Sequence, residues 1–346
     1  MTKRIFIYTC LCVVFCIYSC KQKGVDTVER VSIPLQVISE DMMTSMPGTL
    51  LVHEKEVIWI DATSDNSIHI VDKRSGEEIK TLYVKGEGPN EIITPDISRA
   101  PNRCISVFDS NGAKEVLVFL DSLDMDSQYK KEIWNLDKRL FGLRIIPITH
   151  NQNVFVTPDS VNPFLLSSHS KIDPFGTYPL KEVKEINNKF SVFQGTAIYN
   201  PYSGILLHTI GQLSYVALYT WNGNQFILDK ERNLSEVDYS LQNGNLIINK
   251  TPQYAPTAVA MTKDYIISIE RDKQSSSIGI KEKRNNNDRP FSKAPHTVFV
   301  YDYDFNLMKI IDVKMPVIRI AANGDSNEVY LVGVNPEFCI AKLDLP

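Results

Sequence analysis

The residues best suited to chemistry lie in one short string, residues 85–91, which reads Lys-Gly-Glu-Gly-Pro-Asn-Glu. Lys85, Glu87, Asn90 and Glu91 place an ammonium group, two carboxylates and an amide on a loop that two glycines and a proline make tight. These four residues are therefore candidates for binding a polar ligand or a cation. The alternative is that Glu91 caps backbone N–H groups and so fixes neighbouring structural units.

Known catalytic motifs are missing from the sequence. The string at 85–91 is not a phosphate-binding P-loop, because it lacks Gly-Lys-Ser/Thr and no helix follows. No His-Glu-x-x-His, Gly-x-Ser-x-Gly or Cys-x-x-Cys occurs, and the six histidines are scattered. We therefore predict no catalytic residues, no metal and no cofactor.

Six repeats of about 50 residues must position the string, and a period of this length is typical of a β-propeller. Each repeat has a hydrophobic strand, a polar turn and a second strand that often ends on an acidic residue. The second strands are predicted at residues 57–61, 105–109, 154–157, 205–208, 265–268 and 329–332. The pattern predicts an all-β, six-bladed β-propeller with strands A to D in each blade. Residues 85–91 then join strand D of blade one to strand A of blade two.

The sixth repeat lacks a D strand. Its strands are predicted at Val317–Ala321, Asn327–Gly333 and Phe338–Asp344, where the sequence ends. A propeller hides its exposed edge when one terminus completes the blade that the other began. The extended apolar segment Val31–Ile38 is the natural missing strand, and Pro34 suits an outer strand that lacks one backbone donor. The propeller domain is thus predicted to cover residues 31–346, closed by its N-terminal strand.

These features resemble the TolB-like six-bladed β-propeller lipoproteins of gut bacteria. The string at 85–91 is similar to that family's Gly-x-Gly-Pro-Gly/Asn-Glu element, and residues 297–304 are similar to its fifth-blade strand. Asn90, where glycine is usual, and Ile92, where phenylalanine is common, depart from the pattern. The resemblance implies a lipid-anchored binding or scaffold protein with no established catalytic residues.

An enzymatic alternative stays open, because some six-bladed propellers are Ca²⁺-dependent lactonases. Glu91, Asn200, Asp264 and Asp325 fall near the ends of predicted blades and could converge on a cation in the channel. Nothing in their spacing requires this. A second open question is the insertion at residues 271–295, which is rich in Ser, Asn and Lys. It is either a solvated loop or a basic arm over one mouth of the channel.

The N-terminus has the pattern of a lipoprotein signal. Lys3 and Arg4 precede an apolar stretch, residues 5–18, that is too short to span a bilayer comfortably. The stretch ends in Ser19-Cys20, which resembles a lipobox and implies cleavage before Cys20 and acylation, including palmitate, of that residue. Several buried acyl chains anchor a protein stably. We predict a signal peptide at 1–19 and a lipidated tether at 20–30; the alternative is an ordinary signal peptide with an incidental cysteine.

The residues after Cys20 indicate a cellular location, and the net charge of the chain limits the class of partner. Lys21 is not the aspartate that retains some lipoproteins at the inner membrane, and no acidic export cluster follows. The expected location is the outer membrane, on its periplasmic face. The formal net charge of −4 argues against a nucleic-acid partner, which leaves an envelope protein, a peptide or a glycan. Cys104 and Cys339 lie in different repeats and are predicted to be buried free thiols.

Overall fold

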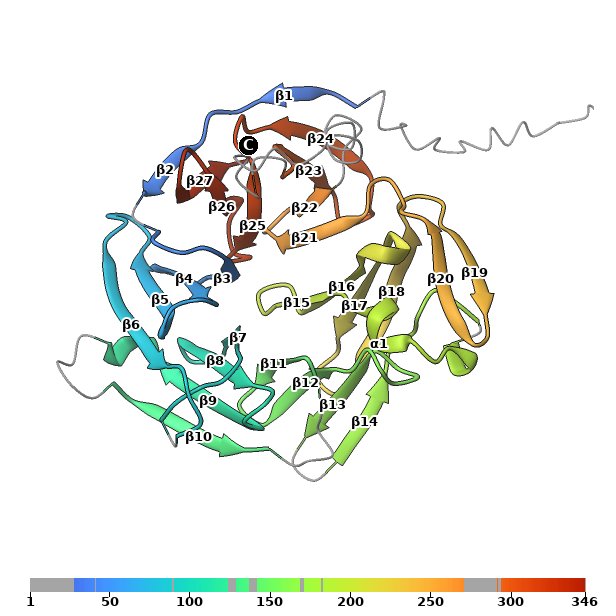
Figure 1. Cartoon of the computed structure of the whole chain (residues 1–346), viewed down its shortest axis with the longest axis horizontal. Helices are drawn as coiled ribbons and strands as arrows, with labels where there is room; N and C mark the ends of the chain where they lie inside the picture. Colours follow the sequence, from blue (N-terminus) through green and yellow to red (C-terminus); the bar gives the residue numbers. More distant parts are fainter. Residues whose placement is uncertain are drawn as a thin grey trace, which may run out of the picture.

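The computed structural model describes residues 28–40, 42–88, 90–123, 129–136, 142–168, 171–181, 183–270, 291 and 294–345. These residues form six sheets arranged as blades around a central axis (Figure 1). The predicted six-bladed β-propeller is confirmed. Cys20 with the predicted tether as far as residue 27, and most of the 271–295 insertion, lie outside the described residues. In the part of the chain that is described, no helix has the length and hydropathy of a membrane span.

The strands follow one another from the axis outwards in each blade. Blade one comprises β3 (Pro47–Val52), β4 (Glu56–Asp61), β5 (Asn66–Asp72) and β6 (Glu78–Val84), and blade two β7 (Pro95–Ala100), β8 (Cys104–Asp109), β9 (Lys114–Phe119) and β10 (Lys131–Asn135). Blade three comprises β11 (Arg144–Thr149), β12 (Gln152–Val156), β13 (Phe164–Ser168) and β14 (Lys171–Phe175), and blade four β15 (Thr196–Asn200), β16 (Ile205–Ile210), β17 (Tyr215–Trp221) and β18 (Phe226–Asn233). Blade five comprises β21 (Pro256–Met261), β22 (Ile266–Glu270), β23 (Thr297–Tyr301) and β24 (Leu307–Asp312), and blade six β25 (Val317–Ala322), β26 (Glu328–Val334) and β27 (Phe338–Asp344).

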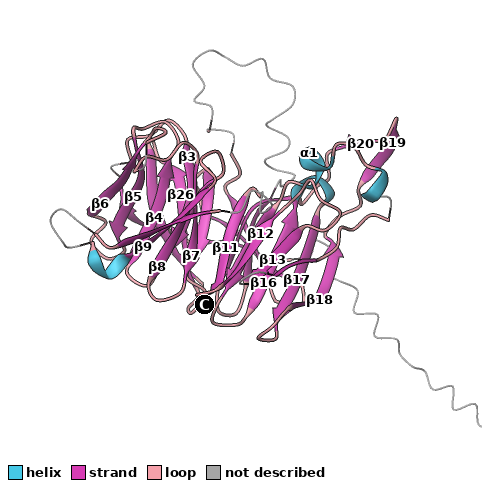
Figure 2. Cartoon of the chain, turned by 90° about the horizontal axis from the view of Figure 1, so that it is seen from below, coloured by secondary structure: helices cyan, strands magenta, loops and turns pink. Residues whose placement is uncertain are grey.

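This order gives the ring two different faces. The A–B face carries the turns between strands A and B and between C and D. The D–A face carries the B–C turns and the connections from one blade to the next. Helix α1 (Lys189–Phe193) and the hairpin of β19 (Asp238–Gln242) and β20 (Asn245–Lys250) belong to such connections, and both rise on the D–A face (Figure 2). The sequence pattern did not reveal either element.

The second strands are buried on both sides, which explains their continuous hydrophobic runs. All six residues of β4 and of β8 are buried between neighbouring blades. The acidic residues at the ends of β4 and β8 accept hydrogen bonds from backbone N–H groups of nearby loops. Asp61 accepts the backbone N–H groups of Thr63 and Ser64 at 2.8 and 3.1 Å. Asp109 accepts those of Ile93 and Thr94 at 2.9 and 3.2 Å, so it fixes the connection between blades one and two.

The N-terminal segment closes the ring, as predicted, but in two pieces. Strand β2 (Gln36–Ser39) pairs antiparallel with β27 and completes blade six. The prediction of one strand over Val31–Ile38 is wrong in its first part. Strand β1 (Arg30–Ser32) instead pairs parallel with β24, as a fifth strand of blade five. Pro34 lies between the two, where the chain crosses from one blade to the next and needs no ladder donor.

The sequence pattern of the third repeat predicts its outer strand at Gly176–Leu180, and the structure places this strand a few residues earlier. The strand is Lys171–Phe175, and Gly176 follows it with φ of +83°. Pro174 hides this strand in the sequence, since proline is unusual within a sheet. An outermost strand tolerates it because one side has no partner.

Candidate functional site

The central channel is a cavity that all six blades share. A cavity of about 530 Å³ is lined by residues of β3, β7, β11, β15, β21 and β25, the innermost strand of each blade (Figure 1). Aliphatic side chains form part of its wall, and among them Leu51 and Ile198 are only partly buried. A concave cavity of this size, with apolar surface and a few placed polar groups, can hold a small molecule.

Three arginines supply the charge of the channel wall: Arg99 of β7, Arg144 of β11 and Arg319 of β25. Within the described part of the chain, the wall contains no acidic side chain. The three guanidinium groups have different partners.

Arg144 is neutralised by a carboxylate. Its Nε and Nη2 donate to the two carboxylate oxygens of Asp96 at 2.6 and 3.0 Å, and Thr49 donates to the same carboxylate at 2.8 Å. Burial acts to lower the pKa of Arg144, but Asp96 raises it above its usual range. This bidentate pair joins blades two and three, and the hydrogen bond from Thr49 links blade one to the same carboxylate.

Arg319 has no carboxylate partner among the described residues. Its Nε donates to the carbonyl of Gly48 at 2.8 Å and its Nη1 to the carbonyl of Ile318 at 2.9 Å. Burial lowers the pKa of this guanidinium. It lies in the first half of β25, and so toward the D–A face. A partly desolvated guanidinium that meets only neutral oxygens is an unusual arrangement.

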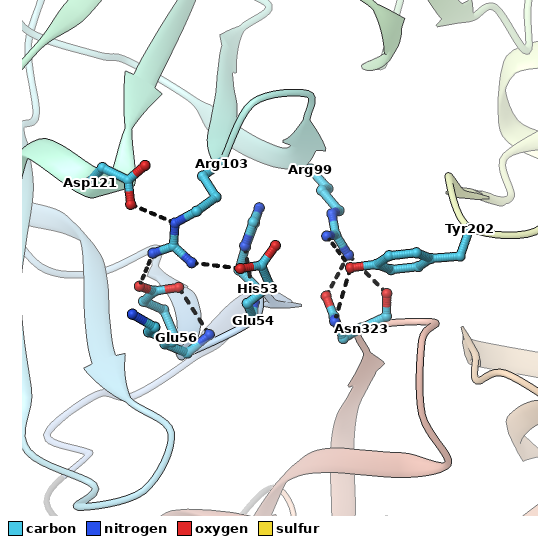
Figure 3. Close-up of polar contacts among 9 residues, drawn as sticks. His53, Glu54, Glu56, Arg99, Arg103, Asp121, Tyr202 and Asn323 are labelled. Carbon is cyan, nitrogen blue, oxygen red and sulfur yellow. Dashed lines mark hydrogen bonds and ion pairs between the residues drawn. The ribbon is translucent and has the colours of Figure 1, made fainter.

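Arg99 forms a bridge across the channel at the opposite end. Its Nη1 donates to the backbone and side-chain oxygens of Asn323, the former at 2.9 Å. Its Nη2 donates to the Tyr202 hydroxyl at 2.7 Å, and the guanidinium lies 4.8 Å from the centre of that ring. The Arg99 bridge (Arg99, Tyr202 and Asn323) joins blades two, four and six at the A–B face (Figure 3).

A second arginine cluster lies beside the bridge on the A–B face. Arg103 donates to Asp121, Glu56 and Glu54 at 2.6, 2.8 and 3.0 Å (Figure 3). Its guanidinium is thus fully engaged by three carboxylates. This cluster joins blades one and two and is structural, in contrast to Arg99 and Arg319, whose partners in the described residues are neutral.

His53 lies between the two arginines and is neutral at pH 7. Burial, with the nearby charges of Arg99 and Arg103, lowers its pKa to about 4. Its Nδ1 accepts the backbone N–H of Glu54 at 3.0 Å, so the ring proton is assigned to Nε2. The channel end therefore presents the Arg99 guanidinium beside a neutral imidazole, while the charge of Arg103 is offset by Glu54, Glu56 and Asp121.

The predicted binding string lies at the periphery of the D–A face, apart from the channel lining. Glu91 turns back into its own loop, where its Oε2 accepts the Gly88 N–H at 2.7 Å. A Cβ on Gly86 would come within 2.1 Å of the same carboxylate, which explains the glycine. Asn90 accepts from Lys131 of the next blade at 2.9 Å. These contacts match the capping alternative for Glu91; that Lys85, Glu87, Asn90 and Glu91 bind a ligand stays a prediction.

The four residues of the lactonase alternative do not meet. Glu91 is on the D–A face, whereas Asn200, Asp264 and Asp325 lie at or beside A–B turns. Asn200 donates to the Gly324 carbonyl at 3.1 Å, and Asp264 accepts from Asn327 at 2.9 Å. Among the described residues, no group of three His, Cys, Asp or Glu side chains is arranged to hold a metal ion.

The two cysteines are buried free thiols, as predicted. Cys104 is in blade two and Cys339 is in blade six. Burial raises the pKa of Cys104 to about 11 and raises that of Cys339. Both thiols are therefore protonated at neutral pH, which makes them poor nucleophiles.

Comparisons with known proteins support the fold and leave the activity open. No family model and no curated protein matches the chain. A solved structure from Bacteroides vulgatus, described as a member of the DUF4221 family, has 13% identity and a TM-score of 0.58, and the match covers 93% of this chain and 98% of that one. A streptogramin B lyase matches with 12% identity and a TM-score of 0.47 over 90% of this chain and 87% of that one. A virginiamycin B lyase from Staphylococcus aureus matches with 13% identity and a TM-score of 0.47 over 88% and 83%. At these identities the similarities establish the propeller fold alone.

Proposed function

We propose that this protein is a lipid-anchored, non-enzymatic binding protein of the cell envelope that takes its ligand into the central channel. The observation that carries the proposal is the cavity lined by all six inner strands, which is bridged at the A–B face by Arg99, Tyr202 and Asn323. The ligand enters from the D–A face. The partner is a peptide, a glycan or a group presented by an envelope protein, and the loop at residues 85–91 adds contacts at the rim.

The course of the N-terminal segment supports an orientation on the membrane. Strand β1 runs parallel to β24, and Val28 packs with Phe305 and Leu307 beside the C–D turn of blade five. The described chain therefore begins at the A–B face. From Cys20 to Val28 the chain reaches at most about 28 Å. An anchor at Cys20 holds the bridged A–B face toward the bilayer and leaves the D–A mouth facing away from it.

The anchor is tested by Cys20→Ala. This substitution should move the protein from the membrane to the released fraction and abolish incorporation of labelled palmitate. Cys16→Ala, within the predicted signal peptide, is the matched control and should leave both unchanged. Retention of the Cys20→Ala protein in the outer membrane would overturn the lipid anchor.

Occupation of the channel is tested by filling it. Ala258 is half-buried in β21 and lines the cavity, so Ala258→Trp should block it. Met43, exposed to 94%, is the control position for a tryptophan outside the cavity. Lipidated protein is captured from detergent-solubilised membranes, and eluted molecules are identified by mass spectrometry. A molecule recovered with the wild type and with Met43→Trp, but lost with Ala258→Trp, supports the channel site. Equal recovery with all three proteins contradicts it.

A further inference from the structure

The charges of the channel wall are out of balance. Three guanidinium groups line it, and Asp96 engages only that of Arg144. The described residues provide no carboxylate for Arg99 or Arg319. The chain as a whole is acidic, with a net charge of −4, so the local excess of positive charge is not a reflection of composition.

Arg319 is the group best placed to meet a ligand. Two of its nitrogens are held by carbonyl groups, while the described residues give its Nη2 no hydrogen-bond partner. Its position in the first half of β25 places it near the D–A mouth. Asn323, which holds Arg99, comes four residues later, roughly 13 Å farther along an extended chain. Arg319 and Arg99 thus act at two depths and do not clamp one group together.

Between these depths part of the wall is apolar. Leu51 and Ile198 line the cavity and are only partly buried. A bare inorganic ion would leave this surface wet, whereas an organic molecule with an apolar body would cover it. A carboxylate, sulfate or phosphate group can accept hydrogen bonds from the unpaired N–H groups of a guanidinium. In a partly buried channel, water screens the attraction between the two charges only weakly.

We propose that the channel binds a small organic anion, with its acidic group paired to Arg319 and its apolar body on the aliphatic wall. This inference rests on the proposed function, because it names the ligand class of the same channel.

The test uses two fluorescent probes with the same aromatic body. 1-Anilinonaphthalene-8-sulfonate carries a sulfonate, and N-phenyl-1-naphthylamine lacks it. The natively folded wild type should bind the sulfonate probe at least tenfold more tightly. Arg319→Gln should remove most of that preference and leave the neutral probe unchanged, and Arg319→Lys should restore part of it. Arg74→Gln, in the exposed C–D turn of blade one, is the control and should change neither affinity.

Two measurements on unaltered protein keep the test independent of how Arg319→Gln folds. Affinity for the sulfonate probe should fall several-fold between 50 and 500 mM NaCl, while that for the neutral probe stays constant. Benzoate or phenyl phosphate should displace the sulfonate probe, with their ranking identifying the acid, and benzamide should not. Equal binding of both probes, or equal displacement by benzamide, would overturn the anion assignment.

The outcomes separate the two proposals. If Ala258→Trp loses both probes but Arg319→Gln and the wild type bind them alike, the channel site stands and its anion preference falls. If Ala258→Trp binds both probes as the wild type does, the channel is not the site and the proposed function fails with it.

Discussion

At the scale of single residues, Glu91 shows how a conspicuous polar residue can serve the fold. Its carboxylate accepts a backbone N–H of its own loop, a charge-assisted hydrogen bond that sets the shape of the connection between blades one and two.

Glu91→Ala should therefore lower the free energy of unfolding by about 1–2 kcal/mol, because the Gly88 N–H loses its acceptor. Urea unfolding followed by fluorescence measures this. Glu87→Ala, at an exposed position of the same loop, should stay within about 0.5 kcal/mol of the wild type. A Glu91→Ala protein of unchanged stability but weaker ligand binding would favour the rim-binding role instead.

His208 makes stability depend on pH. It is buried against Phe164 and Tyr215, and burial lowers its pKa to about 3. The unfolded chain takes up a proton near the ordinary pKa of 6.5 while the folded chain does not, so stability is lost as the pH falls below 6.5. His53, with its pKa lowered to about 4, acts in the same direction.

Between pH 7.5 and pH 5 the free energy of unfolding should fall by about 2 kcal/mol for each of these two histidines. His208→Gln should remove about half of that fall, measured by urea unfolding at both pH values. An unchanged pH dependence in His208→Gln would show that this imidazole is not the group responsible.

At the scale of elements, the strand that completes blade six depends on a glycine in blade one. Gly76 has φ of +74°, and a Cβ there would come within 1.9 Å of the Ile38 carbonyl oxygen of β2. The turn between β5 and β6 thus packs directly on the closing strand.

Gly76→Ala should cost about 3 kcal/mol or more, since left-handed strain of about 1–2 kcal/mol adds to the displacement of β2. Gly223 is the matched control. It has φ of +95°, but a Cβ added there would meet no atom within 4 Å, so Gly223→Ala should cost the strain alone. Similar losses for the two variants, compared by thermal unfolding, would show that contact with β2 contributes little.

The elements also show what a sequence can predict. Hydrophobic runs such as β4, β8 and β27 are predicted to within one residue, because burial on both sides leaves a continuous apolar pattern. The hairpin of β19 and β20 is missed because most of its residues are exposed. The channel arginines are missed for a different reason: Arg99, Arg144 and Arg319 are far apart in the chain, and only ring closure brings them to one cavity.

At the scale of the whole molecule, the ring is held shut by its N-terminal segment. Val31, Ile33 and Leu35 pack on the core of blades five and six, and β2 covers the edge of β27. Without this segment both outer edges would be open to pairing with other chains.

A chain that begins at residue 40 should therefore melt roughly 10 °C lower than one that begins at residue 28, given about 1 kcal/mol for each lost half-buried apolar side chain. It should also aggregate on heating. Both are measured by calorimetry and light scattering. Equal melting temperatures for the two chains would show that the segment is not needed for closure.

The pairing of Gln36 with Lys342 also determines when the ring can close during folding. The chain emerges from its N-terminus wherever it folds, so β2 appears early and must wait for nearly the entire propeller before its partner β27 exists. Blades one to five can form as they emerge, but the ring joins only after β27 has emerged. A chain that stops early, or loses its last strand to a protease, cannot be distinguished by its first five blades from a complete one. The shortened chain differs in that β2 has no partner strand, and this open edge is the feature that quality control in the cell would have to recognise.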